Sequence, residues 1–258
     1  MKITTWNVNS LTARLQHVLE WTAANPVDVL CLQELKLTDD KFPLEVLRSA
    51  GYEHCAVFGQ KTYNGVAIMS RHPLRDVVRN IVGFDDEHSR VIAATLDAPG
   101  GALRLVNGYF VNGQAPGTAK FEYKMSWLRG LRDYLRDEVA RHRRLALLGD
   151  FNIAPEDRDS WDPEGLRETI HHTSDERAHF RKLVELGLCD SFRLFDQPEK
   201  SFSWWDYRML GYQKNRGLRI DHILVSEALK PEVKACTIDR APRKWKQPSD
   251  HAPVTVEL

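Results

Sequence analysis

The sequence has few cysteines and no long apolar run. Its four cysteines, Cys31, Cys55, Cys189 and Cys236, lie far apart and lack the spacing of metal ligands, which is typical of reduced residues in a cytoplasmic protein. No segment approaches the roughly 20 apolar residues that cross a bilayer. The first residues also lack the apolar core of a signal peptide. We therefore expect a soluble protein that is not exported and does not bind a membrane.

The chain also has no net charge, since 36 basic residues balance 36 acidic ones. A zero sum neither predicts nor excludes a polyanionic partner, so the distribution of charge matters more. No internal repeat, low-complexity tract or linker is present. A length of 258 residues is sufficient for one large core. We expect a single domain over residues 1–258, acting as a monomer.

The pattern of apolar residues predicts strands in both halves of the chain, with a few helices between them. Helices are predicted over 11–25, just after Pro43, over 120–142 and over 174–186, the last capped by Ser174. Strands are predicted over 2–8, 28–34, 54–58, 65–70, 77–82, 90–97, 103–110, 145–149, 202–205, 220–225, 233–238 and 254–258. Without strict alternation of strand and helix, this order favours an α/β sandwich with two sheets face to face and helices outside.

Several predicted strands end in polar side chains of one kind. The stretch LALLGDFNIA, residues 145–154, is an apolar strand that ends in Asp150 and Asn152, two positions apart and so on one side of the chain. A carboxylate beside so apolar a segment needs a metal ion, a proton to transfer or a structural hydrogen-bond partner. The other polar strand ends are Asn7, Asn9, Glu34, Asn107, Tyr109, Asn112, Asp221, Asp250 and His251.

A single carboxylate of this kind is most often a structural cap of a loop, but several coincident strand ends point to one shared site. The chain offers no cysteine nucleophile and no glycine-rich nucleotide loop. Carboxylates and carboxamides suit a hard cation, Mg²⁺ or Mn²⁺, which bridges to phosphate oxygens. The residues therefore predict metal-assisted hydrolysis of a phosphoester, in which one carboxylate takes a proton from water.

Eight motifs occur in order from one end of the chain to the other: WNVNSL, LQELK, KTYNGVAI, NGYFVNG, GDFNIAP, FSWWDYR, NRGLRIDHIL and PSDHAPV. In sequence and spacing they resemble the exonuclease III family of DNA-repair enzymes. The resemblance implies a four-layered α/β sandwich, with two mixed, mostly antiparallel sheets and a Mg²⁺ site at their edge. It also implies a hydrolase that acts on double-stranded DNA.

The resemblance assigns roles to the polar strand ends. It implies that Glu34 is the principal metal ligand, with Asn7 and Asp250 near the ion. It implies that Asp150 orients or deprotonates the attacking water, and that Asn152 holds water and phosphate.

By the same resemblance, His251 hydrogen-bonds a phosphate oxygen and is oriented by Asp221, whose charge favours the cationic imidazole. Tyr109 and Asn112 complete the phosphate clamp. Asn9 stands where some relatives have an Asp, so the resemblance does not extend to a second metal ligand there.

DNA binding would use a pocket and two basic segments. The resemblance implies that Trp204, Leu218 and Ile220 line a pocket for a flipped-out sugar, whereas Trp205 is expected in the core. Basic residues of 208–219 and 240–246 flank Asp221 and Asp250 and are expected to contact phosphates. The basic run 141–144, at a helix end, is expected to be structural.

Position 171 bears on which DNA substrate the protein prefers. In TIHHTSDER, residues 169–177, His171 falls where relatives that cut at abasic sites usually have a small residue. An imidazole there would fill space that an extrahelical abasic nucleotide needs, whereas a frayed 3′ end needs less. Some relatives with His here resemble dedicated 3′-phosphatases and 3′→5′ exonucleases. The alternative is that His171 and His172 are solvent-facing loop residues.

We thus expect a hydrolase that processes damaged or recessed 3′ ends of duplex DNA, with the abasic-site endonuclease activity as the alternative. Two further alternatives use the same fold. Inositol-phosphate or sphingomyelin phosphatases are disfavoured by FSWWDYR and NRGLRID. A non-catalytic DNA-binding relative is disfavoured because Glu34, Asp150, Asp221 and Asp250 are all present.

Overall fold

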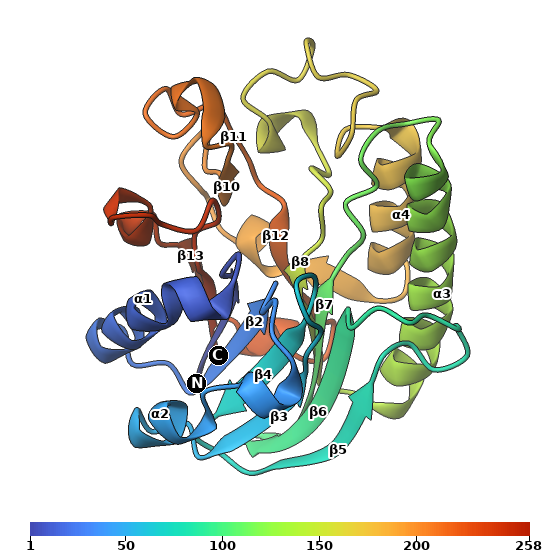
Figure 1. Ribbon diagram of the computed structural model, residues 1–258. Helices are drawn as coiled ribbons and strands as arrows, with labels where there is room; N and C mark the ends of the chain where they lie inside the picture. The colour runs from blue at the N-terminus through green and yellow to red at the C-terminus, as the bar shows by residue number, and fades with distance from the viewer.

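Two six-stranded sheets pack face to face at the centre of the protein (Figure 1). The structure, a computed structural model, describes residues 1–258. In the first sheet only β1 and β2 are parallel. Its strands, in spatial order, are β13 (Ala235–Ile238), β14 (Val254–Glu257), β1 (Lys2–Asn7), β2 (Val29–Gln33), β4 (Val66–Ser70) and β3 (His54–Phe58).

The second sheet has the same mixed character, because only β7 and β8 are parallel. Its strands, in spatial order, are β5 (Leu74–Arg79), β6 (Val91–Ala98), β7 (Gly101–Tyr109), β8 (Leu145–Asp150), β12 (Asp221–Ser226) and β9 (Leu188–Asp190). A two-stranded hairpin of β10 (Trp204–Trp205) and β11 (Gly217–Leu218) lies beyond the end of β12 (Figure 1).

Helices cover the outer face of each sheet. Helices α1 (Leu11–Ala24) and α2 (Leu44–Ser49) pack on the first sheet, and α3 (Ala119–Arg141) and α4 (Ser174–Val184) pack on the second (Figure 1). This confirms the predicted four-layered sandwich. Short 3-10 turns span Asp39–Lys41, Asp157–Asp159, Ser191–Leu194, Arg208–Leu210, Lys230–Glu232 and Ala241–Lys244.

Strand β8 shows why its sequence is apolar throughout. Ala146 and Leu148 belong to the core between the two sheets, whereas Leu145 and Leu147 belong to the core beneath the helices. Successive side chains of a strand point to opposite faces, and here both faces are covered. The polar side chain of Asn107 crosses between the sheets, because its Nδ2 donates to the carbonyls of Leu32 and Ala67.

The boundaries of some elements differ from those predicted. The strand predicted over 77–82 lies at 74–79, because Val77 is exposed on an irregular edge strand and Val82 is exposed in the turn after it, so neither marks a buried face. The cap of α4 is Thr173 rather than Ser174, with Glu176 completing a capping box. The short strands β9 and β11 were not predicted.

The cysteines form no disulfide, and Cys31 and Cys236 are buried. None of the helices combines the length and the apolar character that a membrane crossing requires.

Gly149 lies where the backbones of β7 and β8 leave no room for a side chain. It pairs with Gly108, and its φ is +143°. A Cβ at this position would lie 1.9 Å from the Gly108 carbonyl oxygen, which no rotamer change can relieve because both atoms are fixed to the backbone. Glycine is therefore required immediately before Asp150.

We expect Gly149→Ala to lower the free energy of unfolding by about 3 kcal/mol or more, because strain adds to a backbone clash. Gly101→Ala is the matched control: φ is also positive, +115°, but the new Cβ would meet nothing within 4 Å. This control should cost about 1 kcal/mol. Urea denaturation of both variants tests the prediction, and equal losses would contradict it.

Candidate active site

The predicted polar strand ends meet at one edge of the two sheets. Asn7 ends β1, Glu34 follows β2, and Asp150 ends β8. Asn7 Nδ2 donates to Glu34 Oε1 at 2.8 Å and to Asp150 Oδ2 at 2.9 Å, so it bridges carboxylates attached to different sheets. The sequence-based prediction that these residues share a site agrees with this geometry.

The donor set of this edge fits a hard metal ion. One ligand atom each from Glu34, Asp150 and His251 lies within 4.8 Å of the other two. Carboxylate and carboxamide oxygens are what Mg²⁺ and Mn²⁺ prefer. The Lys36 ammonium, 2.9 Å from Glu34 Oε2, balances part of the negative charge. The residues able to hold an ion are therefore the two carboxylates and the neighbouring Asn7.

His251 is held by a buried carboxylate. Its Nδ1 lies 2.9 Å from Asp221 Oδ2, and its Nε2 lies 3.7 Å from Asp150 Oδ2. Burial on its own would lower the pKa of His251, but the charges of Asp221 and Asp150 outweigh it and raise the pKa to about 10. The ring is therefore cationic at neutral pH, and Nε2 donates rather than binding a metal.

Ser203 fixes Asp221 in turn. The Ser203 hydroxyl donates to Asp221 Oδ2 at 2.6 Å and accepts the backbone N–H groups of Ile220 and Asp221. Ser203 was not predicted as a site residue, although it lies in the FSWW motif. Lys36 was not predicted either, although it stands in LQELK two positions after the predicted metal ligand.

Asp150 has the surroundings of a group that exchanges protons near neutral pH. Burial raises its pKa, the charge of His251 lowers it and the charge of Asp221 raises it, with a net result of about 7. Its Oδ1 accepts the backbone N–H of Asn152 at 2.9 Å. A carboxyl group with this pKa can take and return a proton at physiological pH.

Tyr109, Asn112 and Asn152 lie on the adjoining strand ends. Tyr109 is paired with Asp150 across β7 and β8. Burial and then the charges of Glu34 and Asp150 raise the pKa of Tyr109 well above its ordinary value, so the phenol remains a hydrogen-bond donor. Asn112 Nδ2 donates to Asn152 Oδ1 at 3.1 Å, which joins the two predicted phosphate-binding carboxamides.

Asp250 is not part of the group formed by Glu34, Asp150 and His251. Its Oδ1 accepts from Asn9 Nδ2, and its Oδ2 accepts from Trp204 Nε1, both at 2.9 Å. The structure thus brings Asp250 together with the predicted sugar pocket through Trp204. A metal role of Asp250 stays a prediction.

A cavity of about 390 Å³ adjoins the site and contains His171, Trp204 and Leu218, three of the residues predicted to bind substrate. Ile220, which was also predicted to line this pocket, packs with Leu218 in a small apolar cluster. Trp161 and Met209 also line the cavity, and neither was predicted. Trp205 is fully buried, as expected of a core residue.

His171 is a fixed part of the wall of this cavity rather than a solvent-facing residue. Its side chain is buried, and its Nδ1 donates to the Asn152 carbonyl at 2.7 Å. The ring lies 6.5 Å from the Trp204 ring, centroid to centroid. Burial and the charge of Lys124 lower the pKa of His171 to about 3, so the imidazole is neutral. His172 is also buried, so neither histidine is a mobile surface group.

Two arginines of the predicted DNA-contacting segments are structural. Arg219 is buried, and its guanidinium pairs with Asp159 and Asp190, each at 2.7 Å. Arg243 is buried over the rings of Trp205 and Tyr212. For these two residues the prediction of phosphate contact is wrong, because paired and stacked guanidinium groups inside the protein cannot reach DNA.

Two other basic residues of these segments, Arg208 and Arg216, line the 390 Å³ cavity, and their contact with phosphate stays a prediction. In the run 141–144, Arg144 pairs with Glu232, which agrees with a structural role.

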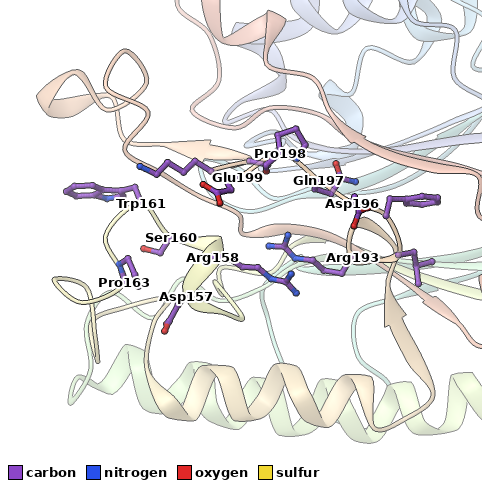
Figure 2. A pocket seen from close by; sticks show the side chains of 14 residues that line it. Asp157, Arg158, Ser160, Trp161, Pro163, Arg193, Asp196, Gln197, Pro198 and Glu199 are labelled. Atoms are coloured by element: carbon purple, nitrogen blue, oxygen red, sulfur yellow. The ribbon is translucent and has the colours of Figure 1, made fainter.

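The largest cavity, about 930 Å³, lies on the other side of Trp161 and contains none of the predicted site residues. Figure 2 shows Arg158 and Arg193 pointing into it. Both are already paired, Arg158 with Glu156 and Arg193 with Asp159. The size of a cavity therefore does not identify the candidate site, which lies at the edge where the carboxylates converge.

The sequence model described as the endonuclease/exonuclease/phosphatase family matches residues 4–251. Exodeoxyribonuclease III of Haemophilus influenzae is 36% identical, with 100% of each chain covered. Among solved structures, the 3′ phosphatase NExo from Neisseria bound to a product DNA hairpin is 50% identical, with a TM-score of 0.96 over 100% of this chain and 99% of that one. An AP endonuclease from Archaeoglobus fulgidus is 33% identical, with a TM-score of 0.94 and the same coverage.

The protonation of His251 can be measured directly. Without added metal ions, we expect its ring NMR signals to keep the chemical shifts of an imidazolium between about pH 5.5 and 8.5, because the pKa lies near 10, with only a small displacement near pH 7 as Asp150 titrates beside it. The stability that this cation contributes is full below about pH 6.5 and is lost as the pH rises through 10. Asp221→Asn should bring the midpoint down into the measured range. A change from imidazolium to neutral imidazole shifts with a midpoint below about 8 in the natural protein would contradict the prediction.

Proposed function

The chain belongs to the endonuclease/exonuclease/phosphatase family, and we propose that it is a metal-dependent hydrolase that processes the 3′ ends of double-stranded DNA. Its reactions would be 3′-phosphatase and 3′→5′ exonuclease. The observation that carries the proposal is His171, a buried imidazole in the wall of the pocket beside Trp204. The solved relative described as a 3′ phosphatase, at 50% identity over the whole chain, supports it.

The proposed chemistry is an in-line attack of water on phosphorus. Asp150 and Asn152 would hold the water, and Asp150 would take its proton as the new P–O bond forms. The bond from phosphorus to the 3′ oxygen breaks, and that oxygen takes a proton from solvent, which leaves a 3′-hydroxyl on the DNA; Asp150 then returns its proton to solvent. Removal of a 3′-phosphate and of a 3′-nucleotide break the same bond, so one site serves both.

The remaining groups would stabilise charge and position the phosphate. The His251 cation and the Tyr109 phenol can donate to phosphate oxygens, which carry more charge in the transition state. A Mg²⁺ or Mn²⁺ ion, held by Glu34 with Asn7 near it, would neutralise part of that charge when bound. Asn112 holds Asn152 through its side chain, so the two carboxamides act as one clamp.

Abasic-site cleavage is the second candidate. It breaks the same bond, and the AP endonuclease from Archaeoglobus fulgidus supports it. It differs in substrate shape, because the duplex continues beyond the lesion and the abasic nucleotide must turn into the pocket. His171 narrows that pocket, which favours a frayed 3′ end. We further propose that the protein acts as a monomer in the cytoplasm, where its four free cysteines would stay reduced.

The substrate preference can be tested with three labelled duplexes: an internal abasic analogue, a nicked 3′-phosphate and a recessed 3′-hydroxyl. We expect removal of the 3′-phosphate to be at least about tenfold faster than abasic cleavage. The reason is that one steric conflict in a binding pocket changes the ratio of rates for two substrates by about tenfold or more. His171→Gly should raise abasic cleavage, and glycine also suits the φ of 71° at this position.

His72→Gly is the control for that experiment, because it removes an imidazole that lies outside this cavity, partly exposed and beside Asp28. It should leave the preference unchanged. If the natural protein cuts the abasic duplex as fast as it removes the phosphate, the steric role of His171 is wrong.

Metal dependence has its own test. A chelator should abolish hydrolysis, and Mg²⁺ should restore it. Glu34→Gln should raise the Mg²⁺ concentration for half-maximal activity by about tenfold or more, because a principal ligand is weakened. Asn112→Ala should lower kcat without changing that concentration. Binding of Mn²⁺ followed by electron paramagnetic resonance measures the same change without turnover, and undiminished binding by Glu34→Gln would refute the assignment.

A further inference from the structure

A buried ion pair connects the two helices that cover the second sheet. Lys124 on α3 and Glu176 on α4 are both completely buried, and the Lys124 ammonium is paired with Glu176 Oε1. Charges inside a protein are costly unless they are paired and their hydrogen-bonding capacity is used. Neither residue is one of the polar strand ends, so the pair requires its own explanation.

Every proton of the Lys124 ammonium has an acceptor. Besides Glu176, Nζ donates to the Asn152 carbonyl at 2.8 Å and to the Asn112 carbonyl at 3.2 Å. The side chain passes Gly113 so closely that a Cβ there would lie 2.9 Å from Lys124 Cδ. Lys124 therefore holds the backbone of both carboxamide residues that clamp the phosphate in the proposed reaction.

Glu176 holds the loop that carries His171. Its Oε1 accepts the backbone N–H of His171 at 3.1 Å, and its Oε2 accepts the backbone N–H and hydroxyl of Thr173 at 3.0 and 2.8 Å. The His171 ring donates to the same Asn152 carbonyl that Lys124 holds. The pair thus links the clamp to the residue that narrows the pocket.

The backbone conformations of Asn152 and His171, the two residues that the ion pair connects, are intrinsically unfavourable. Asn152 has a φ of 51° and His171 a φ of 71°, in the left-handed region that residues with a Cβ seldom adopt. Such conformations persist where the surrounding contacts determine them. Here those contacts are supplied by Lys124 and Glu176.

We propose that Lys124 and Glu176 are positioning residues, which set the geometry of Asn152 and of His171 together. Reactivity and preference for the 3′ end then depend on one buried pair, although neither of its members touches substrate. The inference rests on the proposed function for the identity of the reaction. It goes beyond that function in assigning both rate and specificity to residues outside the site.

The double variant Lys124→Met/Glu176→Gln tests this, because it removes both charges but keeps a side chain able to cap α4. We expect kcat for 3′-phosphate removal to fall about tenfold or more, with a smaller change in KM, since misplaced groups lose transition-state contacts. The ratio of abasic cleavage to 3′-phosphate removal should rise about threefold or more, as the His171 loop loosens.

Arg104→Met/Glu138→Gln is the matched control. Arg104 and Glu138 form another buried ion pair, 2.6 Å apart, which joins β7 to the opposite end of α3. This variant loses the same kind of interaction far from the site. It should keep both kcat and the substrate ratio, while thermal unfolding shows a loss of stability comparable to that of the test variant.

A folded double variant with the kcat and the substrate ratio of the natural protein would overturn the positioning role. If circular dichroism shows that it does not fold, Glu176→Gln alone is measured. It should change kcat and the ratio in the same directions, and no change would equally overturn the role. A natural protein that cannot remove a 3′-phosphate would overturn the proposed function instead, so the two failures are distinguishable.

Discussion

The constraint on which this structure depends is the cost of placing several carboxylates at the edge of two apolar sheets. Burial penalises the charged form of each, and like charges add to that penalty. The cation of His251 lies between Asp150 and Asp221 and offsets this cost, and the amide of Asn7 lies between Asp150 and Glu34. The same arrangement that makes the edge stable makes it chemically poised, because Asp150 is left near its midpoint of protonation at neutral pH.

The fold class and the polar residues at the strand ends could be predicted from the sequence, because both depend on the pattern of apolar and polar residues within short segments. Strand β8 is apolar on both faces and stops at a glycine before Asp150, and such a run predicts both a doubly covered strand and a polar group at its end. The fold class follows from similar strands in both halves. Parallel pairing of β1 with β2 and of β7 with β8 then brings the polar ends to one edge, which the order of strands alone does not determine.

What could not be predicted depends on contacts between distant parts of the chain. Arg219 and Arg243 were expected to face DNA, yet each is withdrawn into the protein by partners far from it in sequence. Asp250 is next to His251 in the chain but turns to Asn9 and Trp204. The burial of Lys124 could have been predicted, because Lys124 follows Phe121 by three residues and precedes Leu128 by four and so lies on the apolar face of its helix. A structural role of its partner Glu176 could also have been predicted, because Glu176 is the last residue of a capping box that begins at Thr173.

The ends of the chain lie together, as Figure 1 shows, with the terminal amine 2.7 Å from the Leu258 carbonyl and β1 paired with β14. One side of the carboxylate cluster is built by Asn7 and Glu34, and the other by Asp221 and His251. The cluster therefore forms only after segments near opposite ends of this sequence have come together. Folding must close this longest loop, which makes completion of the site a late event.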